Sequence, residues 1–451
     1  MPKSFGWSSI ARTFWAFHKP NSPMRLTLSL MGWSLIGVMG WGLTGCVNVQ
    51  DQAKASNTTP PPETSTASAS PTSNGAALSA EPWLAGLSDA DQTILKESWQ
   101  AYKQRFIQND GRVIDWESQS RTVSEGQAYA MLRAVWMDDP ETFEKTLAWA
   151  ESNLQRWQGD RQVDSLWAWK WGQKPDQSWG TIDANFASDA DVDAIAALIL
   201  ASRRWNQPEY LTLARTKLKD LWQQAVIDES NTLYLLPGPA QAFRPQPDEV
   251  LLNPSYLFPS AFRLFAQVDD THDWMRLVED SYGLLENAAT LSNVGLPSDW
   301  VRVNLRTQSV QPVLNQESLS SQYGFDAYRV WWRVTLDAQW FKEERAIAFL
   351  RQSLDHPKSL WKAEQQIPAR IDLAGKPLVP YEATAQYAML YAAFQVVDPA
   401  IAAELHPKLL STYQNGIWDN PNAYYVQNLA WFGLSTPVLV PDTLLQARPT
   451  P

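Results

Sequence analysis

Cysteine and histidine are scarce in this chain of 451 residues, which contains one Cys and four His. A single cysteine, Cys46, excludes an intramolecular disulfide. The histidines are scattered and no His-Glu-x-x-His pattern joins them, so the usual ligands of a zinc site are lacking. We therefore expect no metal and no cofactor. The four histidines are His18, His272, His356 and His406.

Basic residues are also in deficit, with 37 Lys and Arg against 48 Asp and Glu and a net charge of −11. Nucleic-acid binding depends on basic side chains for phosphate contacts, so we expect no nucleic-acid partner. Tryptophan, by contrast, is abundant, at 24 residues. Indole rings are typical of a hydrophobic core, and they also suit a sugar-binding cleft because pyranose rings stack on their faces. Composition alone leaves both interpretations open.

Residues 1–45 have the pattern of a secretion signal, in which four basic side chains precede a largely apolar, uncharged run that begins at Leu26. This run is also long enough to span a bilayer as an uncleaved helical anchor. Its end, Leu43-Thr44-Gly45-Cys46, resembles a bacterial lipobox, which predicts a lipoprotein signal peptide and lipidation of Cys46. Met24 is an alternative start. We expect a lipid-anchored protein on the periplasmic or extracellular side of a bacterial cell envelope.

A low-complexity segment follows the lipobox. Residues 46–80 are rich in Ser, Thr, Ala and Pro, with almost no large apolar side chain, so this segment is predicted to be a disordered tether. Residues 81–440 are expected to form one folded catalytic domain. Residues 441–451 are Pro-rich and are expected to be a flexible tail.

The folded part is predicted to be all-α. Ser88 followed by Asp91 resembles a capping box at the start of a first helix. One short strand is expected at 233–236. Twelve helices of similar length indicate a toroid of helical hairpins, although periodicity alone fits a solenoid nearly as well. Apolar periodicity predicts the other eleven helices at 124–137, 140–155, 189–204, 208–226, 254–268, 274–289, 326–338, 342–354, 383–397, 399–413 and 422–433.

Three predicted helix starts carry acidic residues, namely Glu125, Asp189 and Asp326. Ser124 is a suitable N-cap, which places Glu125 in a first helical turn. An acidic residue there is also favoured by the helix dipole, so each position alone is ambiguous. Asp326 is followed three residues later by Arg329, with which it can form an ion pair.

Seven short motifs follow one another along the folded part of the chain. They are Asp110-Gly111-Arg112-Val113, Ser124-Glu125-Gly126-Gln127-Ala128-Tyr129, Leu166-Trp167-Ala168-Trp169-Lys170, Ala187-Ser188-Asp189-Ala190-Asp191, Asn253-Pro254-Ser255-Tyr256, Ser298-Asp299-Trp300 and Phe325-Asp326-Ala327-Tyr328-Arg329. Together they resemble glycoside hydrolase family 8, also called cellulase family D, and within it the endoglucanases associated with bacterial cellulose synthases. The resemblance covers residues 88–436 and implies an (α/α)6 barrel of six inner and six outer helices, with inverting hydrolysis.

The resemblance also implies roles for individual residues. Glu125 falls on the general acid, Asp326 on the general base, and Asp189 on a third carboxylate that holds the sugar at the cleavage point. The resemblance also implies that Trp169, Arg329 and Tyr256 bind substrate. We expect Tyr129, Gln127 and Asp183 to bind substrate as well.

Protonation of the acid needs an explanation, because a helix N-terminus lowers the pKa of a carboxyl group. This effect suits a base at Asp326 and opposes an acid at Glu125. We expect burial and an ionised Asp189 nearby to raise the pKa of Glu125. Phe325 stands where the family commonly has Tyr, so a hydroxyl contact to the attacking water is either lost or supplied by Tyr323.

These patterns favour a monomeric endo-β-1,4-glucanase that hydrolyses cellulose or a related β-glucan. We expect a link to cellulose synthesis or export, with the cellulose synthase machinery as a partner. Two alternatives remain open at this stage. The same site could serve chitosan, xylan or mixed-linkage glucan. A weakly catalytic β-glucan-binding component of an export system is the second alternative.

Overall fold

The computed structural model describes residue 84 and residues 86–314, 319–438 and 440–446. The predicted signal peptide, Cys46 and the tether at 46–80 lie outside the described residues. All elements discussed below belong to the described part of the chain.

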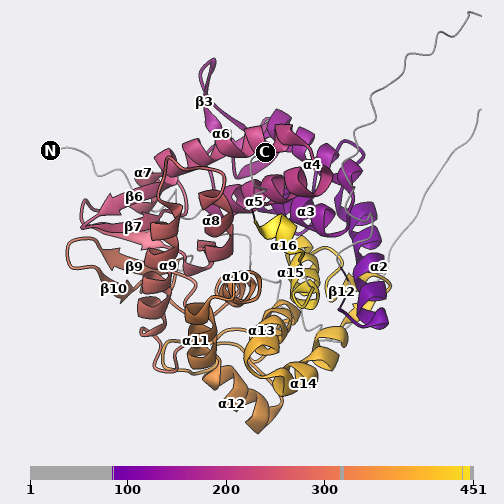
Figure 1. Cartoon of the computed structure of the whole chain (residues 1–451), viewed down its shortest axis with the longest axis vertical. Helices are drawn as coiled ribbons and strands as arrows, with labels where there is room; N and C mark the ends of the chain where they lie inside the picture. Colours follow the sequence, from indigo (N-terminus) through magenta and orange to yellow (C-terminus); the bar gives the residue numbers. More distant parts are fainter. Residues whose placement is uncertain (1–83, 85, 315–318, 439, 447–451) are drawn as a thin grey trace, which may run out of the picture. The chain divides into compact units, whose positions relative to one another are not determined.

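Six helices form a closed inner ring, seen end-on in Figure 1. Each helix packs on the next in chain order, and the last packs on the first, so the ring closes. This closure decides between the two architectures that periodicity left open, because a solenoid has free ends. The inner helices are α3 (Ser124–Trp136), α5 (Ser188–Trp205), α8 (Pro259–Ala266), α10 (Tyr328–Trp340), α13 (Thr384–Val397) and α15 (Tyr424–Ser435).

Six further helices surround this ring. Five of them follow an inner helix in the chain and pack on it as the second arm of a hairpin. The helix α2 completes the set by packing on α15, which joins the two ends of the described domain. The architecture is therefore the predicted (α/α)6 barrel of six inner and six outer helices. The outer helices are α4 (Pro140–Asn153), α6 (Pro208–Ala225), α9 (Trp274–Ala289), α11 (Glu344–Ser353), α14 (Pro399–Leu410) and α2 (Asp89–Phe106).

The inner and outer helices differ in how much of their surface is buried. Every residue of α5 except Trp205 is buried, whereas its outer partner α6 buries only one stripe that includes Leu218 and Leu221. A helix that is apolar on all sides is stable only when other elements surround it. Outer helices also begin with strong start signals. Ser88 caps α2 by accepting a hydrogen bond from Asp91 N, and Pro occupies the first turn of α4, α6 and α14.

Several elements differ from the predicted ones. The helix expected at 254–268 is split into a 3-10 turn, η1 (Pro254–Tyr256), and α8, because Pro259 disfavours helical geometry at Phe258. Among residues 441–451, Leu444 and Leu445 are buried in a short helix that packs against α5. Three helices had no counterpart in the prediction. They are α7 (Ala240–Phe243), α12 (Asp355–Glu364) and α16 (Asp442–Leu445).

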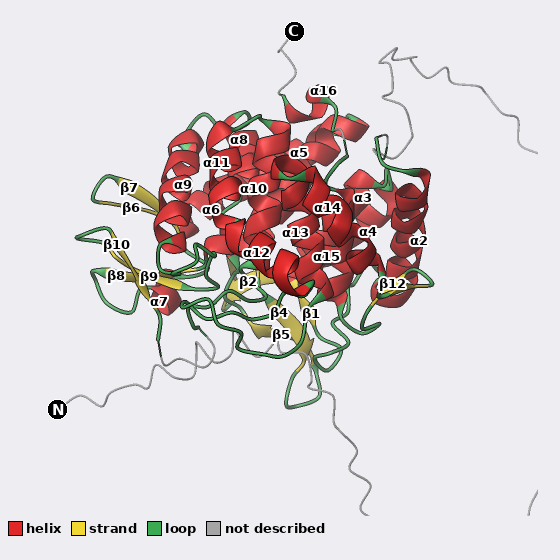
Figure 2. Cartoon of the chain, turned by 90° about the horizontal axis from the view of Figure 1, so that it is seen from below, coloured by secondary structure: helices red, strands yellow, loops and turns green. Residues whose placement is uncertain are grey.

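Short antiparallel strands form five small sheets in the described loops of the helical barrel. Their strand orders are β1-β4-β5, β10-β9-β8, β2-β3, β6-β7 and β11-β12. The strand expected at 233–236 corresponds to β7. The sheet of β1, β4 and β5 lies at the loop-bearing end of the barrel (Figure 2). The strands are β1 (Thr122–Val123), β2 (Gln155–Gln158), β3 (Arg161–Trp167), β4 (Lys170–Gln173), β5 (Trp179–Asp183), β6 (Val226–Glu229), β7 (Thr232–Leu235), β8 (Glu249–Leu252), β9 (Val301–Asn304), β10 (Ser309–Pro312), β11 (Tyr413–Gln414) and β12 (Ile417–Trp418).

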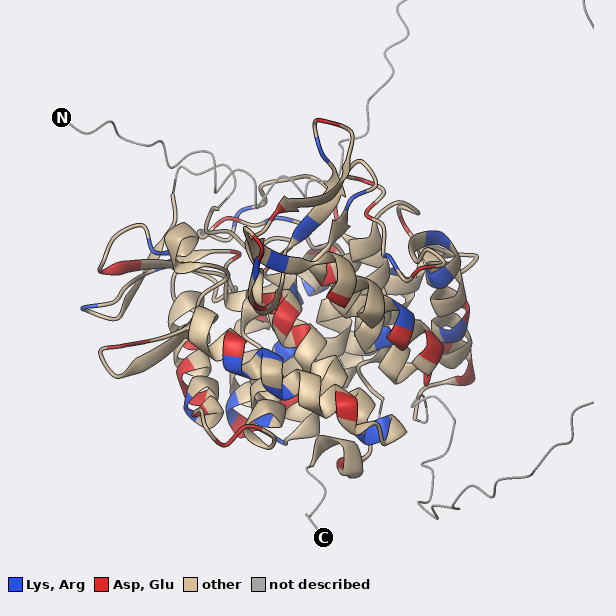
Figure 3. Ribbon diagram, turned by 90° about the horizontal axis from the view of Figure 1, so that it is seen from above, with Lys and Arg blue, Asp and Glu red and all other residues tan. Residues whose placement is uncertain are grey.

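Acidic and basic side chains are intermixed on the helices in the view of Figure 3. Arg345 on α11, for example, pairs with Glu286 and Glu279 on α9. Such exposed pairs are screened by water and contribute little to stability. The charges that matter for chemistry lie in the barrel interior.

Candidate active site

Three carboxyl groups meet at the N-terminal ends of inner helices. Glu125 is the second residue of α3, Asp189 is the second residue of α5, and Asp326 lies two residues before α10 begins. Ser124 is itself the first residue of α3, so the expectation that its side chain caps this helix is wrong. The Ser124 backbone instead donates a hydrogen bond to the carbonyl oxygen of Trp169 (3.0 Å), which ties the helix start to the strand region.

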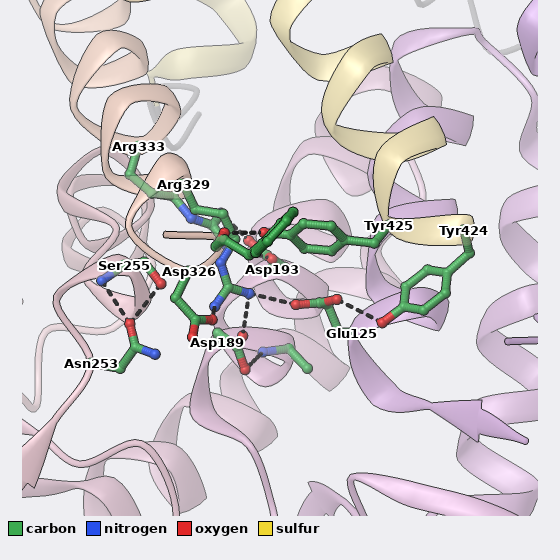
Figure 4. A network of polar contacts seen from close by, with 12 residues as sticks. Glu125, Asp189, Asp193, Asn253, Ser255, Asp326, Arg329, Arg333, Tyr424 and Tyr425 are labelled. Atoms are coloured by element: carbon green, nitrogen blue, oxygen red, sulfur yellow. Dashed lines mark hydrogen bonds and ion pairs between the residues drawn. The ribbon is translucent and has the colours of Figure 1, made fainter. Parts of the chain in front are cut away.

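Arg329 links all three carboxyl groups, as Figure 4 shows. Its Nη1 donates to Glu125 Oε2 and to Asp189 Oδ2 (2.9 Å), and its Nη2 donates to Asp326 Oδ1 (2.6 Å). The predicted ion pair between Arg329 and Asp326 is therefore confirmed. The guanidinium is planar with a fixed fork of donors, so it holds Glu125 and Asp326 on different nitrogen atoms. Arg329 is only 1% exposed, which makes these interactions little screened.

A second ion pair lies one helical turn deeper in the barrel. Asp193 follows Asp189 on α5, Arg333 follows Arg329 on α10, and Arg333 Nη2 donates to Asp193 Oδ2 (2.7 Å). This network thus contains four carboxyl groups and two guanidinium groups, an excess of two negative charges if every acid is ionised. Like charges at short range oppose ionisation, so the network favours retention of a proton.

Glu125 has the environment of a protonated acid. Burial raises its pKa, and the charge of Asp193 raises it further, while Arg329 and a hydrogen bond donated by Tyr424 oppose the rise. That bond runs from the Tyr424 hydroxyl to Glu125 Oε1 over 2.8 Å. The expected effect of burial is confirmed and is the largest cause of the rise. The carboxylate that raises the pKa of Glu125 further is Asp193, rather than the expected Asp189.

Asp189 and Asp326 are also buried. Burial and the charge of Glu125 raise the pKa of Asp189 to about 6. Burial likewise raises the pKa of Asp326, and Arg329 is the main group that opposes the rise. The expectation that a helix start would lower the pKa of Asp326 is therefore wrong, because desolvation outweighs the dipole. Asp326 Oδ2 is buried and has no hydrogen-bond partner among the described residues, so this carboxyl group keeps one unused acceptor oxygen.

Asp299 supports the loop that carries Asp326. Its Oδ1 accepts a hydrogen bond from the backbone N–H of Ala327 (2.9 Å), and its Oδ2 accepts one from Gln322 Nε2 (3.0 Å). Burial raises the pKa of Asp299 to about 6. A Cβ at Gly324 would lie 2.6 Å from Asp299 Oδ2, so this contact requires glycine. The Ser298-Asp299-Trp300 motif marked this residue, but its support of Asp326 was not predicted.

Tyr256 lies beside Arg329, whereas Trp169 and Asp183 belong to the strand region that contacts the start of α3. Trp169 is 5% exposed and sits beside Lys170, whose Nζ is 5.5 Å from the ring centroid. Tyr256 is 9% exposed, and its ring centroid lies 5.2 Å from the Arg329 guanidinium carbon. Asp183 is half-buried at the end of β5 and accepts a hydrogen bond from Asn185 N (3.0 Å). Contact of these residues with substrate stays a prediction.

Gln127 and Tyr129 are both fully buried on α3. Gln127 accepts a hydrogen bond from Val113 N and donates to the carbonyl oxygens of Gly111 and Thr146. Its amide therefore braces the loop before β1, and the expectation of substrate contact is wrong. Tyr129 packs edge-on against Trp332 and Phe432, and its contact with substrate stays a prediction.

Two adjacent tyrosines at the start of α15 were missed. Tyr424 binds Glu125, and the Tyr425 hydroxyl donates to the carbonyl oxygen of Phe325 (2.6 Å), next to Asp326. Their position at a helix start, like that of the acids, is the signal that could have identified them. Tyr323 does not supply a hydroxyl to the site, because it accepts a hydrogen bond from Trp331 Nε1 (3.1 Å) in the core.

Two buried carboxyl groups on different nitrogens of one guanidinium, one of them with an unpaired acceptor oxygen, are the chemical groups that a glycoside hydrolase needs. The chain belongs to the glycosyl hydrolases family 8, whose family model matches residues 75–436. It is 32% identical to an endoglucanase of Xanthomonas axonopodis pv. citri over 284 residues, which is 61% of this chain and 68% of that protein. It is 33% identical to a Pseudomonas fluorescens endoglucanase over 211 residues, 45% of this chain and 50% of that protein.

The fold comparison agrees with the family. The crystal structure of an endo-1,4-D-glucanase from Vibrio fischeri superposes with a TM-score of 0.63 at 25% identity, covering 75% of this chain and 93% of that one. Within the described part of the chain, no cluster of three or more His, Cys, Asp and Glu side chains could hold a metal ion. None of the described helices has the length and hydropathy needed to span a bilayer.

Proposed function

We propose that this family 8 hydrolase is an inverting endo-β-1,4-glucanase that acts on cellulose or a related β-glucan. The observation that carries the proposal is the Arg329 bridge, which assigns Glu125 and Asp326 to different nitrogens of one guanidinium. Inverting enzymes need their two carboxyl groups roughly 6.5–9.5 Å apart, so that a water molecule fits between the base and the sugar. A guanidinium between the carboxyls keeps them from forming a directly hydrogen-bonded pair.

The reaction proceeds in one displacement. Glu125 donates its proton to the glycosidic oxygen as the bond from this oxygen to the anomeric carbon breaks. A water molecule bound at Asp326 Oδ2 attacks the anomeric carbon from the opposite face and gives its proton to Asp326. The product therefore carries inverted configuration. Asp189, which shares Arg329 Nη1 with Glu125, holds the sugar ring at the cleavage point.

Arg329 has opposite consequences for the two catalytic groups. Its charge favours the ionised form of every carboxyl group that it contacts, which Asp326 needs as the base. Glu125 must be protonated in spite of that charge, and burial together with Asp193 provides the opposing effect. In this proposal one cation contacts the acid, Glu125, the base, Asp326, and the carboxyl group that holds the sugar, Asp189.

The test is to digest carboxymethylcellulose with residues 81–451 and to follow the first-formed anomer by NMR. Inversion of a β-linked chain predicts the α-anomer first, and a β-anomer would refute the mechanism. A panel of chitosan, xylan and mixed-linkage glucan ranks the substrates. Glu125→Gln removes the proton donor and should abolish turnover, so wild-type-like turnover in this variant would refute the role of Glu125.

We propose further that the enzyme is held at the cell envelope by a lipid on Cys46 and acts near a cellulose synthesis or export machinery. The lipobox-like segment before Cys46 and the tether at 46–80 support this proposal. Membrane fractionation of wild type and Cys46→Ala tests it. The variant should appear in the soluble fraction, and retention in the membrane fraction would contradict a lipid anchor.

A further inference from the structure

Three indole rings form a ladder from the hydrophobic core to the surface at the loop-bearing end of the barrel. Trp149 on α4 is buried and meets Trp171 on β4 edge-on, with ring centroids 5.2 Å apart. Trp171 stacks on Trp179 of β5, with centroids 5.4 Å apart and an interplanar angle of 29°. Trp179 is 48% exposed, so the ladder ends in an open aromatic face.

Arg112 fixes the outer two rings of this ladder. Its guanidinium carbon lies 4.7 Å from the ring centroids of both Trp171 and Trp179. The guanidinium is itself held, because Nε donates to Thr122 Oγ1 (2.8 Å) and Nη2 donates to the carbonyl oxygen of Ser120. A cation against an indole face is favourable, and a ring that is already ordered loses little entropy when a ligand stacks on it. Trp179 is therefore preorganised.

The ladder is continuous with the active site through one sheet. Strand β4 pairs with β1, placing Trp171 opposite Thr122, and β1 is followed directly by the helix start that carries Glu125. Figure 2 shows β1, β4 and β5 together at that end. The four residue steps from Trp169 to Gln173, which pairs with Trp179, span about 13 Å at strand geometry. Trp179 thus lies at the opposite end of the β4–β5 hairpin from Trp169, which is expected to bind substrate.

We propose that Trp179 is a distal sugar-binding subsite, on which a pyranose ring of a β-glucan chain stacks as the chain leaves the active site. The proposal rests on the proposed function, because it extends the same substrate along the same sheet. A flat indole matches the apolar face of a pyranose ring. The exposed apolar side chains of the β4–β5 hairpin are only Trp179 and Ile182, whereas a protein partner needs about 800 Å² on each side.

The experiment compares kcat/KM on carboxymethylcellulose with kcat/KM on cellotetraose, the short substrate that the proposal expects to bind at the carboxyl groups without contacting Trp179. In Trp179→Ala the polymer-to-tetraose ratio should fall about tenfold, because stacking on an aromatic side chain is worth about 1–3 kcal/mol. Trp179→Phe keeps a stacking face and should retain most of the ratio. The matched control is Trp157→Ala, since Trp157 is 50% exposed on the separate β2–β3 hairpin, and it should keep the wild-type ratio.

The outcomes separate this proposal from the proposed function. A wild-type ratio in Trp179→Ala, with the wild type active on both substrates, would overturn the subsite. An equal fall in Trp157→Ala and Trp179→Ala would also overturn it, because the effect would then belong to any exposed indole. A wild type that cleaves neither substrate would instead refute the endoglucanase activity.

Discussion

Removal of the Arg329 charge should move the acid limb of the pH–rate profile, the side on which activity rises with pH. Arg329→Met keeps most of the side-chain volume and deletes the cation that favours ionised Asp326. The base works only when ionised, and loss of a positive neighbour raises its pKa, so the acid limb of kcat/KM should shift to higher pH. Arg329→Lys is the matched control, because it keeps a charge without the two-nitrogen fork.

The size of this shift follows from the contact. Arg329 Nη2 and Asp326 Oδ1 are 2.6 Å apart, and both side chains are nearly inaccessible to solvent. Two unit charges about 4 Å apart at an effective dielectric constant of about 20 interact by about 4 kcal/mol. That energy corresponds to about 3 pKa units as an upper limit. Relaxation and protonation of the neighbouring acids reduce the effect, so we expect an upward shift of about 1 to 3 pH units.

The assay is kcat/KM on a soluble β-glucan between pH 3 and 9, at constant ionic strength, with folding verified by circular dichroism. In Arg329→Lys the limb should move by less than about 1 unit while turnover falls, because one ammonium cannot contact three carboxyl groups in the same geometry. An unchanged acid limb in folded Arg329→Met would refute the argument that this charge holds Asp326 ionised.

Three further predictions concern the groups around the carboxyls. Tyr424→Phe removes a hydrogen bond that lowers the pKa of Glu125, so the basic limb of kcat/KM should move upward by about 1 pH unit, and a downward shift would contradict it. Gly324→Ala should lower stability by about 1–3 kcal/mol in a urea titration, because its Cβ collides with Asp299; a neutral result would show that the loop yields. Burial raises the pKa of Asp299 to about 6, so its stabilising contribution is complete below about pH 4 and is lost as pH rises through 6. Asp299→Asn should therefore flatten the fall of Tm between pH 4 and 7, and an unaltered slope would contradict this assignment.

Local sequence patterns sufficed for most of the helices and failed for the strands. Helix starts such as Ser88 before α2 and Pro208 in α6 are local signals, because caps and first-turn prolines act within a few residues. The strands are two to seven residues long and mostly carry no apolar alternation, so their pairing depends on partners supplied by the barrel. The break before Pro259 was readable from the chain but was overridden by the apolar period around it.

Residues that are close in sequence can lie on different sides of a helix, and this explains an incorrect prediction in the Ser124–Tyr129 motif. Gln127 follows Glu125 by two residues, which places it about 200° around the helix axis, toward the loop that it braces. Tyr129 lies one turn further along the same face as Glu125, and this turn takes it into the barrel interior. The Ser124–Tyr129 motif therefore combines an acid with structural support at Gln127.

The sequence by itself determined the helical class and the positions of Glu125, Asp189 and Asp326 at helix starts. These are local properties of periodicity, capping and composition. Only the tertiary structure decided that Arg329, 204 residues from Glu125, bridges all three acids. It also decided that burial, rather than the helix dipole, governs their pKa values. Charge interactions depend on the distance between groups, and desolvation depends on how deeply a group is buried. Neither quantity can be obtained from the order of residues along the chain.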